Sequence, residues 1–404
     1  MDIGFATALL VLGGILVVTA ALSGWLHGTV LSASVLSVLA GVALSLTGVL
    51  SVSPDATIVL LIVELALILT LFSDGLYVER ELLEQHWGPA ARALALAMPV
   101  TLVLLALAAK ALFPALSWSE AFLLGAVLSP TDPVVTSSVV TSERVPRVVR
   151  HTLNLESGVN DGLALPFVLF FLVLATNTGN AVGEAVKLGG QAVVGAVIGL
   201  ALAFVGGRAL SRLPQPGVTE RYEGVYALGI GLAAYGLAEV TYGNGLIAAF
   251  VAGIALAVAR HDVPEAFSEF NETLSSAFQV ITFVVFGAVV EATGYGGNTG
   301  SLLVFIAFAL VVARPLAVAV ALVGVELPRP QKVFVAWFGP KGVASILFAL
   351  LVLASDVGNR QLVFEVSSFT VLASIFAHGL TDTLGAAWIE RRLEGREQAP
   401  GYSS

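Results

Sequence analysis

Residues Gly125–Gly162, with the sequence GAVLSPTDPVVTSSVVTSERVPRVVRHTLNLESGVNDG, decide the fold. They place Asp132, Glu156 and Asp161 inside segments that are otherwise apolar enough to span a lipid bilayer. A carboxylate at the centre of a bilayer costs at least about 2.5 kcal/mol on insertion scales. These three acidic residues therefore need a compensating role in the molecule.

Asp132 lies in the pentapeptide Ser129–Pro133, SPTDP. Pro130 and Pro133 each remove a backbone donor and crowd the preceding turn, so we expect the helix to open here and leave carbonyl oxygens unpaired. Broken helical backbone beside a carboxylate is typical of a cation site in a membrane protein.

The composition indicates a polytopic membrane protein and excludes an ordinary soluble domain. Hydrophobic residues make up 57% of the 404 positions and charged residues only 12%. The net charge of −9 gives no case for nucleic acid, and without cysteine there are no disulfides and no thiol chemistry. No basic segment precedes the first apolar run, so we expect no cleaved signal peptide; we also expect no attached soluble domain and no cofactor.

Apolar runs of membrane-spanning length predict an all-α fold with thirteen transmembrane helices. They lie near residues 3–24, 29–50, 57–76, 93–113, 119–140, 152–175, 184–206, 223–240, 243–260, 275–291, 301–323, 331–354 and 362–387. With the N-terminus outside and the C-terminus in the cytoplasm, fourteen of the 19 basic residues fall on the cytoplasmic side. Only Lys110, Lys187 and Arg360 fall outside, and this asymmetry supports both the number of helices and the orientation.

A second interruption matches the first. The twelfth span carries Gly339–Gly342, GPKG, seven spans after the broken fifth. An odd offset inverts the topology, so we expect two inverted six-helix repeats, and paired interruptions are the best sequence pointer to a transporter's midplane site. The alternative is that proline and glycine are simply common in membrane helices. Asp132 is expected to neutralise the helix ends at the first break and Lys341 those at the second.

The repeats divide a single transporter domain, residues 1–404. Repeat 1 covers about 3–175, a linker helix 184–206, repeat 2 about 223–387, and a short cytoplasmic tail 388–404.

The sixth span presents oxygen atoms on one face. Ser157, Asn160 and Asp161 are spaced i, i+3 and i+4, and hydroxyl, amide and carboxylate oxygens together suit a hard cation. Glu156 needs a partner, and Arg314 is the unassigned basic residue within a span. A bidentate structural ion pair is favoured over direct coordination by Glu156, which leaves Asp161 as the titrating group.

At these residues the chain resembles the monovalent cation:proton antiporters of the NhaP and NHE kind. The matching pieces are Thr131-Asp132-Pro133, Glu156-Ser157 followed by Asn160-Asp161, and Arg314. The resemblance covers essentially the whole chain and implies crossed unwound helices, as in NhaA and NhaP.

The resemblance also implies residue roles. Asp161, Asp132, Thr131 and Ser157 would bind Na+ or Li+, while Glu156, Asn160 and Arg314 would form a structural network. Such antiporters are homodimers in which a six-helix core moves against a dimerisation domain. Lys341 departs from the pattern, because relatives commonly have arginine there. The segment Leu65–Leu69 followed by Phe72–Gly75 looks like the third helix of relatives that handle K+, so the identity of the ion stays open.

The expected function is exchange of Na+ or Li+ for H+ across a prokaryotic cell membrane, serving sodium and pH homeostasis. A proton on Asp161 removes the charge that the cation needs, so the two compete and alternating access couples them. Because Asn160 cannot carry a proton, we expect 1:1 electroneutral exchange. Alternatives are K+/H+ exchange, a passive cation channel or a non-transporting sensor. Protease motifs are absent, so an enzyme is not expected.

Other intramembrane polar residues carry less weight. Glu64 either lines the ion path or is bonded to neighbouring hydroxyl groups, and His378 is interpreted as a packed or pH-tuning residue. Asp74, Glu239 and Asp382 lie near span ends, where a side chain easily reaches the interface, so none is predicted to be a ligand.

Overall fold

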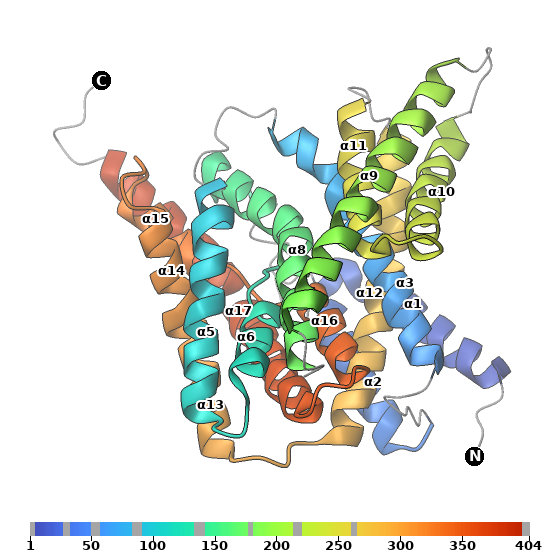
Figure 1. The fold of residues 1–404 in the computed structure, drawn as a ribbon. Helices are drawn as coiled ribbons and strands as arrows, with labels where there is room; N and C mark the ends of the chain where they lie inside the picture. Colours follow the sequence, from blue (N-terminus) through green and yellow to red (C-terminus); the bar gives the residue numbers. More distant parts are fainter. Residues whose placement is uncertain are drawn as a thin grey trace.

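The computed structural model describes residues 5–26, 33–49, 57–82, 91–132, 142–176, 181–212, 220–259 and 265–397, and all regular secondary structure in them is helical (Figure 1). The helices before residue 213 are α1 (Phe5–Leu26), α2 (Ala33–Leu46), α3 (Thr57–Leu82), η1 (Ala93–Ala97), α5 (Met98–Leu112), α6 (Trp118–Val127), α8 (Arg147–Ala175) and α9 (Ala181–Arg212). Those after it are α10 (Glu220–Glu239), α11 (Gly245–Ala259), α12 (Glu265–Thr293), α13 (Thr299–Phe308), η3 (Ala309–Ala313), α14 (Arg314–Ala321), α15 (Arg329–Trp337), α16 (Val343–Leu353) and α17 (Arg360–Glu397).

Helices lie over the described parts of the ranges expected to span the membrane. Within the described residues, six helices are long and apolar enough to cross a bilayer: Ala93–Leu112, Arg147–Ala175, Val186–Ala209, Ser276–Thr293, Thr299–Ala321 and Arg360–Leu393. Residues 133–141, which include Pro133 and the second half of the expected fifth span, lie outside the described residues. The number of crossings stays a prediction.

The helices form two groups (Figure 1). The frame group consists of α1, α2, α3, α9, α10, α11 and α12; the site group consists of η1, α5, α6, α8, α13, η3, α14, α15, α16 and α17. In the view of Figure 1, α9, α10 and α11 stand at the right and α5, α13, α14 and α15 at the left. Helix α3 joins the groups, because it packs against α11 on one side and against α8 and α16 on the other.

Glycines bring helices of the frame group into backbone contact. Gly41 on α2 and Gly287 on α12 face each other's helix so closely that a methyl group at either would overlap backbone atoms opposite. Gly75 on α3 and Gly253 on α11 make the same close approach. Small residues allow this in lipid, where van der Waals contact rather than the hydrophobic effect holds helices together.

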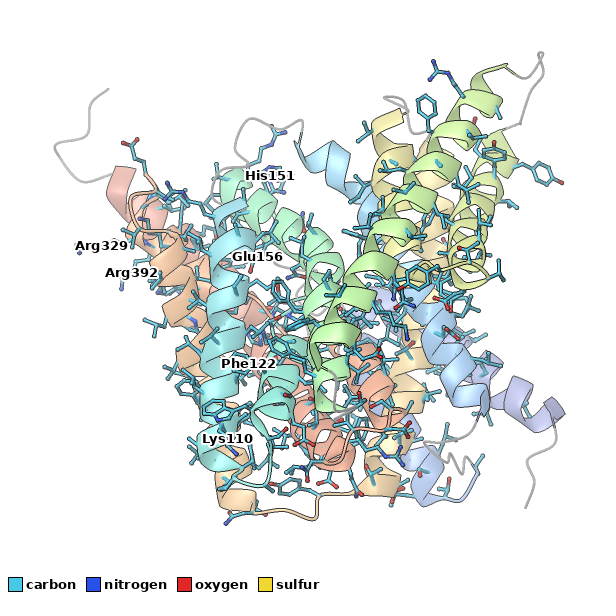
Figure 2. All side chains as sticks on the ribbon, viewed as in Figure 1. Lys110, Phe122, His151, Glu156, Arg329 and Arg392 are labelled. Carbon is cyan, nitrogen blue, oxygen red and sulfur yellow. The ribbon has the colours of Figure 1, made fainter. Side chains whose placement is uncertain are left out.

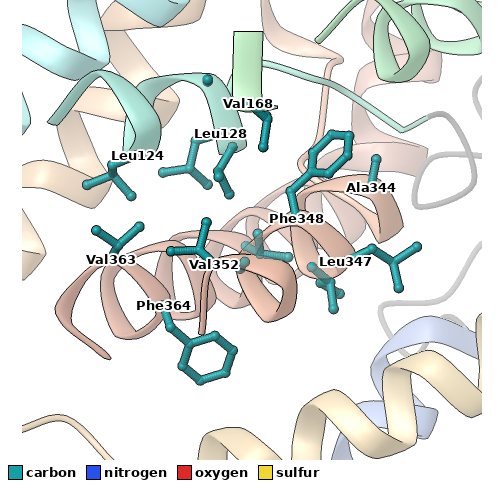
Figure 3. Close-up of a cluster of buried hydrophobic side chains, with 14 of the residues drawn as sticks. Leu124, Leu128, Val168, Ala344, Leu347, Phe348, Val352, Val363 and Phe364 are labelled. Atoms are coloured by element: carbon teal, nitrogen blue, oxygen red, sulfur yellow. The ribbon is translucent and has the colours of Figure 1, made fainter. Parts of the chain in front are cut away.

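The core of the site group is apolar around short helices. Leu124 at the end of α6 and Val168 on α8 lie above Phe348 and Val352 of α16, which in turn pack beside Phe364 of α17 (Figure 3). Helix α16 is buried along almost its whole length, so it is a half-length helix enclosed by its neighbours rather than one exposed to lipid.

At one end of the bundle, the carboxylate of Glu120, in the first turn of α6, binds two loops. It accepts hydrogen bonds from the backbone N–H groups of Ser117 (2.7 Å) and Asn359 (2.8 Å), and from the amide of Asn359. Ser117 caps the same helix in return, so the two residues form a capping box. Glu120 thereby joins the loop 113–117 to the loop 354–359.

Basic residues mark the two ends of the bundle. Lys110 lies at the end with the Glu120 contacts and donates to the carbonyl of Leu116 (2.5 Å), whereas Arg329 and Arg392 lie at the opposite end (Figure 2). Lys110 is one of the three basic residues expected outside, and Arg329 and Arg392 are among the fourteen expected inside. These three residues thus lie at the ends expected relative to one another, while which end faces the cytoplasm stays a prediction.

Candidate ion-binding site

The two interrupted helices meet at their breaks. Helix α6 ends at Val127, and residues 129–132 are not helical; the second break is the extended segment 338–342 between α15 and α16. The backbone N–H of Asp132 donates to the carbonyl of Pro340 (2.9 Å). Gly342 allows this contact, since a methyl group there would overlap the side chain of Asp132.

Each break receives the charge of the other. The Asp132 carboxylate accepts from the backbone N–H of Val343 (3.0 Å), the first residue of α16, where a helix N-terminus favours an anion. The Lys341 ammonium, 1% exposed, donates to the carbonyl of Pro130 (3.3 Å). The expectation that each charge neutralises its own break is therefore wrong. The two breaks cross so closely that Asp132 contacts the second break and Lys341 contacts the first.

The face of α8 that was expected to carry oxygen ligands lies against the first break. The Asn160 amide donates to the hydroxyl of Thr131 (2.7 Å), and the Ser157 hydroxyl donates to the carbonyl of Leu153 (2.5 Å). Both hydroxyl oxygens keep lone pairs that can face a cation. Asn160 thus joins Thr131, rather than the pair of Glu156 and Arg314 with which the resemblance grouped it.

Two oxygens on this face have no hydrogen-bond partner among the described residues. They are Oδ1 of Asp161 and Oδ1 of Asn160, and both residues are buried. Buried polar atoms in proteins are usually paired, because an unpaired one costs about 1–3 kcal/mol. These oxygens therefore indicate the place where a further ligand fits.

Glu156 and Arg314 form the expected bidentate pair. Nη1 of Arg314 lies 2.7 Å from Oε1 of Glu156, and Nη2 lies 3.0 Å from Oε2. Both side chains are buried, and the guanidinium lies against Gly339, where no larger residue fits. The pair therefore joins α8 and α14 to the second break, and both oxygens of Glu156 are occupied by the guanidinium.

Asp74 is an acidic residue with an electrostatic link to the site, to which the sequence interpretation gave no role as a ligand. It lies on α3, in the frame group, and its carboxylate interacts electrostatically with those of Asp132 and Asp161. Its Oδ2 atom is buried and has no hydrogen-bond partner among the described residues. The residue as a whole is half-buried, and whether Asp74 serves the ion stays a prediction. The signal that could have found it is the likeness of Phe72–Gly75 to the third helix of ion-handling relatives.

Two other acidic residues have local partners. The hydroxyl of Tyr235 donates to the exposed Glu64, which matches the alternative that Glu64 is bonded to a neighbouring hydroxyl. Glu239 accepts from the backbone N–H of Gly245 (2.8 Å), the first residue of α11. Neither is among the carboxylates that interact at the crossing of the breaks.

The donor set is suited to a weakly held alkali ion. The described residues contain no cluster of three His, Cys, Asp or Glu side chains in metal-binding geometry. The oxygens available at the crossing are instead carboxylate, amide and hydroxyl groups from two elements, the first break and α8. Such hard ligands in an open arrangement fit a monovalent cation that binds and leaves.

A family model described as "Sodium/hydrogen exchanger, transmembrane" matches residues 13–384. A K(+)/H(+) antiporter NhaP of Alkalimonas amylolytica is 26% identical over 343 residues, which are 84% of this chain and 59% of that protein. A Na(+)/H(+) antiporter 2 of Zygosaccharomyces rouxii is 24% identical over 366 residues, which are 80% of this chain and 45% of that protein. The chain thus spans about half the length of these relatives.

The fold is that of a solved antiporter. The structure of the sodium proton antiporter MjNhaP1 from Methanocaldococcus jannaschii at pH 8 superposes with a TM-score of 0.75 at 22% identity, over 95% of this chain and 98% of that chain. An electron-microscopy map of the same antiporter gives a TM-score of 0.77 at 21% identity. The extent of the family match, from residue 13 to residue 384, means that this chain belongs to the transmembrane sodium/hydrogen exchanger family.

Proposed function

We propose that this protein is a secondary active antiporter that exchanges Na+ or Li+ for H+. The observation that carries the proposal is the buried Oδ1 of Asp161, which has no hydrogen-bond partner among the described residues, on the face of α8 that lies against the first break. Asp161, Asp132, Thr131 and Ser157 supply the ion ligands, and none of these roles requires a cofactor.

Competition for one pocket produces the coupling. A bound cation needs the negative charge of Asp161, and a proton on Asp161 removes that charge, so the site carries one or the other. Both oxygens of Glu156 are held by Arg314, and Asn160 has no proton to exchange. One Na+ therefore replaces one H+, and the moving site has the same net charge in both directions.

We further propose the architecture expected from the sequence: a single transporter domain (1–404) with thirteen crossings, repeat 1 (3–175), linker helix (184–206), repeat 2 (223–387) and a cytoplasmic tail (388–404). Two π-helical turns support inverted repeats. In the fourth expected span η1 is followed by Met98-Pro99, and in the eleventh, seven spans later, η3 is followed by Arg314-Pro315.

The assembly and orientation belong to the same proposal. The protein lies in a prokaryotic cell membrane as a homodimer, with the N-terminus outside and the C-terminus in the cytoplasm. The site group moves against the frame group during alternating access, which opens the crossing of the breaks to each side in turn.

A second candidate is K+/H+ exchange. The relative from Alkalimonas amylolytica is named as a K(+)/H(+) antiporter, whereas the relative from Zygosaccharomyces rouxii is named as a Na(+)/H(+) antiporter. The two candidates differ in cargo and share the competing proton.

The test uses purified protein in liposomes that contain a pH-sensitive dye. Gradients of Na+, Li+ and K+ are imposed separately while a permeant anion clamps the membrane potential. Proton movement that follows Na+ or Li+ supports the main proposal, and movement that follows K+ alone supports the second. A channel would move protons only while the potential is free, and a sensor would move none, so either outcome rejects both. Liposomes without protein measure the leak.

A further inference from the structure

The second break is held by residues of α17 that have no assigned role. The Ser374 hydroxyl accepts from the backbone N–H of Lys341 (2.9 Å), and Nε2 of His378 lies 2.9 Å from the carbonyl of Trp337. Nδ1 of His378 lies 3.2 Å from the Ser374 hydroxyl and 2.7 Å from the Ser374 carbonyl. Ser374 and His378 are buried. Together they contact the chain on both sides of Pro340.

Both ring nitrogens of His378 face backbone carbonyls, and the ring donates to Trp337 when Nε2 carries a proton, as it does in the charged ring and in one of the two neutral tautomers. The carbonyl of Trp337 lies at the end of α15, where it accepts from the backbone N–H of Gly339 (2.9 Å) as well as contacting His378. The N–H of Lys341 lies in the extended segment, outside both half-helices. The two side chains therefore satisfy backbone groups that the break exposes.

This pair is placed like the pair at the first break. Ser157 and Asp161 are four residues apart on α8, and Ser374 and His378 are four residues apart on α17. The chain separation between the two pairs is within one residue of the separation between η1 and η3. In the proposed inverted repeats, α17 is the counterpart of α8, with a basic residue where α8 has the acidic one.

We propose that Ser374 and His378 are positioning residues for the cation site. By fixing Trp337 and Lys341, they hold the carbonyl of Pro340 on the N–H of Asp132 and the Lys341 ammonium on the first break. They act through these groups and do not touch the ion. Their removal lets the segment 338–342 shift, so cation affinity falls while the rate at saturating cation is kept. This inference rests on the proposed antiport.

The experiment compares His378→Leu, His378→Gln, Ser374→Ala and wild type. Glutamine reaches as far as the imidazole, and its amide can donate to Trp337 and accept from Ser374. Thr370→Val is the matched control, because Thr370 is a buried hydroxyl of the same helix that donates only within α17, to Val366 (2.7 Å). The readouts are the half-saturating cation concentration, the maximal rate, and the rise of the melting temperature with added Na+, Li+ or K+.

We expect His378→Leu and Ser374→Ala each to raise the half-saturating concentration about tenfold, as for the loss of one buried hydrogen bond. His378→Gln should stay within about threefold of wild type, and Thr370→Val should match wild type. Equal half-saturation in His378→Leu and Thr370→Val would overturn the proposal, as would a glutamine variant no better than leucine.

The design separates this inference from the proposed function. If wild type shows no cation-driven proton movement, antiport fails, and the melting series still measures whether the α17 variants weaken cation binding. If wild type exchanges but the variants bind and transport cations as it does, only the positioning role fails. If His378→Leu does not fold, Ser374→Ala and His378→Gln decide the outcome by the same criteria.

Discussion

Glu156 and Asp161 lie on the same helix, are both buried (4% and 6% exposed), and differ in their partners. Both oxygens of Glu156 are held by Arg314, whereas Oδ1 of Asp161 has no hydrogen-bond partner among the described residues. Burial alone therefore does not separate a structural carboxylate from a transporting one. The presence of a fixed counter-ion does, because it removes the group from competition between cation and proton.

The largest effect on stability is expected from substitutions in the pair of Glu156 and Arg314. Glu156→Gln or Arg314→Ala leaves a buried charge without its partner, which costs about 3–5 kcal/mol of unfolding free energy. The measurement is unfolding in detergent, with Asp356→Asn, an exposed carboxylate, as control. The double variant Glu156→Gln/Arg314→Gln should regain part of the loss. Wild-type stability in both single variants would show that the pair is not structural.

Asp161→Asn should have the opposite effect, abolishing exchange without lowering stability. Loss of a charged ligand worth about 3 kcal/mol lowers cation binding at least about a hundredfold, so exchange in liposomes falls below the leak. Stability without cation should not fall, since a buried amide needs less solvation than a carboxylate. Substantial exchange by this variant would remove Asp161 from the site, and Asp132→Asn tests the second carboxylate in the same way.

Asp74, on α3 of the frame group, tests whether an acidic residue that interacts electrostatically with Asp132 and Asp161 also affects cation binding. Asp74→Asn should raise the half-saturating cation concentration about tenfold, which corresponds to about 1.4 kcal/mol of lost electrostatic attraction. Glu64→Gln is the matched control on the same helix and should leave it unchanged. Equal behaviour of the two variants would exclude Asp74 from the ion's surroundings.

The last prediction is that the membrane potential has no effect on the Na+/H+ equilibrium. One Na+ replaces one proton on Asp161, so an imposed potential of about 100 mV, worth about 2.3 kcal/mol per moved charge, should not shift the Na+/H+ equilibrium. The potential is set with valinomycin and a K+ gradient. A shift would mean that a second proton moves. Asp74 is then the group to substitute first, rather than the exposed Glu64.

Much of the site could be predicted from the sequence, because its signals are local. The prolines around Asp132 and the Gly339–Gly342 segment interrupt helices wherever those helices pack. The spacing of Ser157, Asn160 and Asp161 fixes a shared face, and Arg314 was the one basic residue in a span without another role. Each of these inferences needs only backbone chemistry or helical periodicity.

The remainder depends on how the helices pack. In a bilayer both faces of a helix are apolar, so the pattern of α3 does not tell which face turns inward, and the electrostatic link of Asp74 to Asp132 and Asp161 cannot be predicted from it. The exchange of Asp132 and Lys341 between the breaks depends on a crossing set by Gly342. His378 on α17 contacts Trp337 at the end of α15, and no local sequence motif predicts a contact between residues so far apart in the chain.

The contact between Lys341 and the carbonyl of Pro130 has a consequence for membrane insertion during synthesis, since its partners are 211 residues apart. A lysine at mid-membrane costs about 2.5–3.5 kcal/mol on insertion scales. The first break is synthesised before the second, so its contact with Lys341 forms only after the second break has been made. The helices α15 and α16 are each too short to cross a bilayer of about 30 Å alone. The twelfth span therefore becomes stable in lipid only when it docks against the first half of the chain.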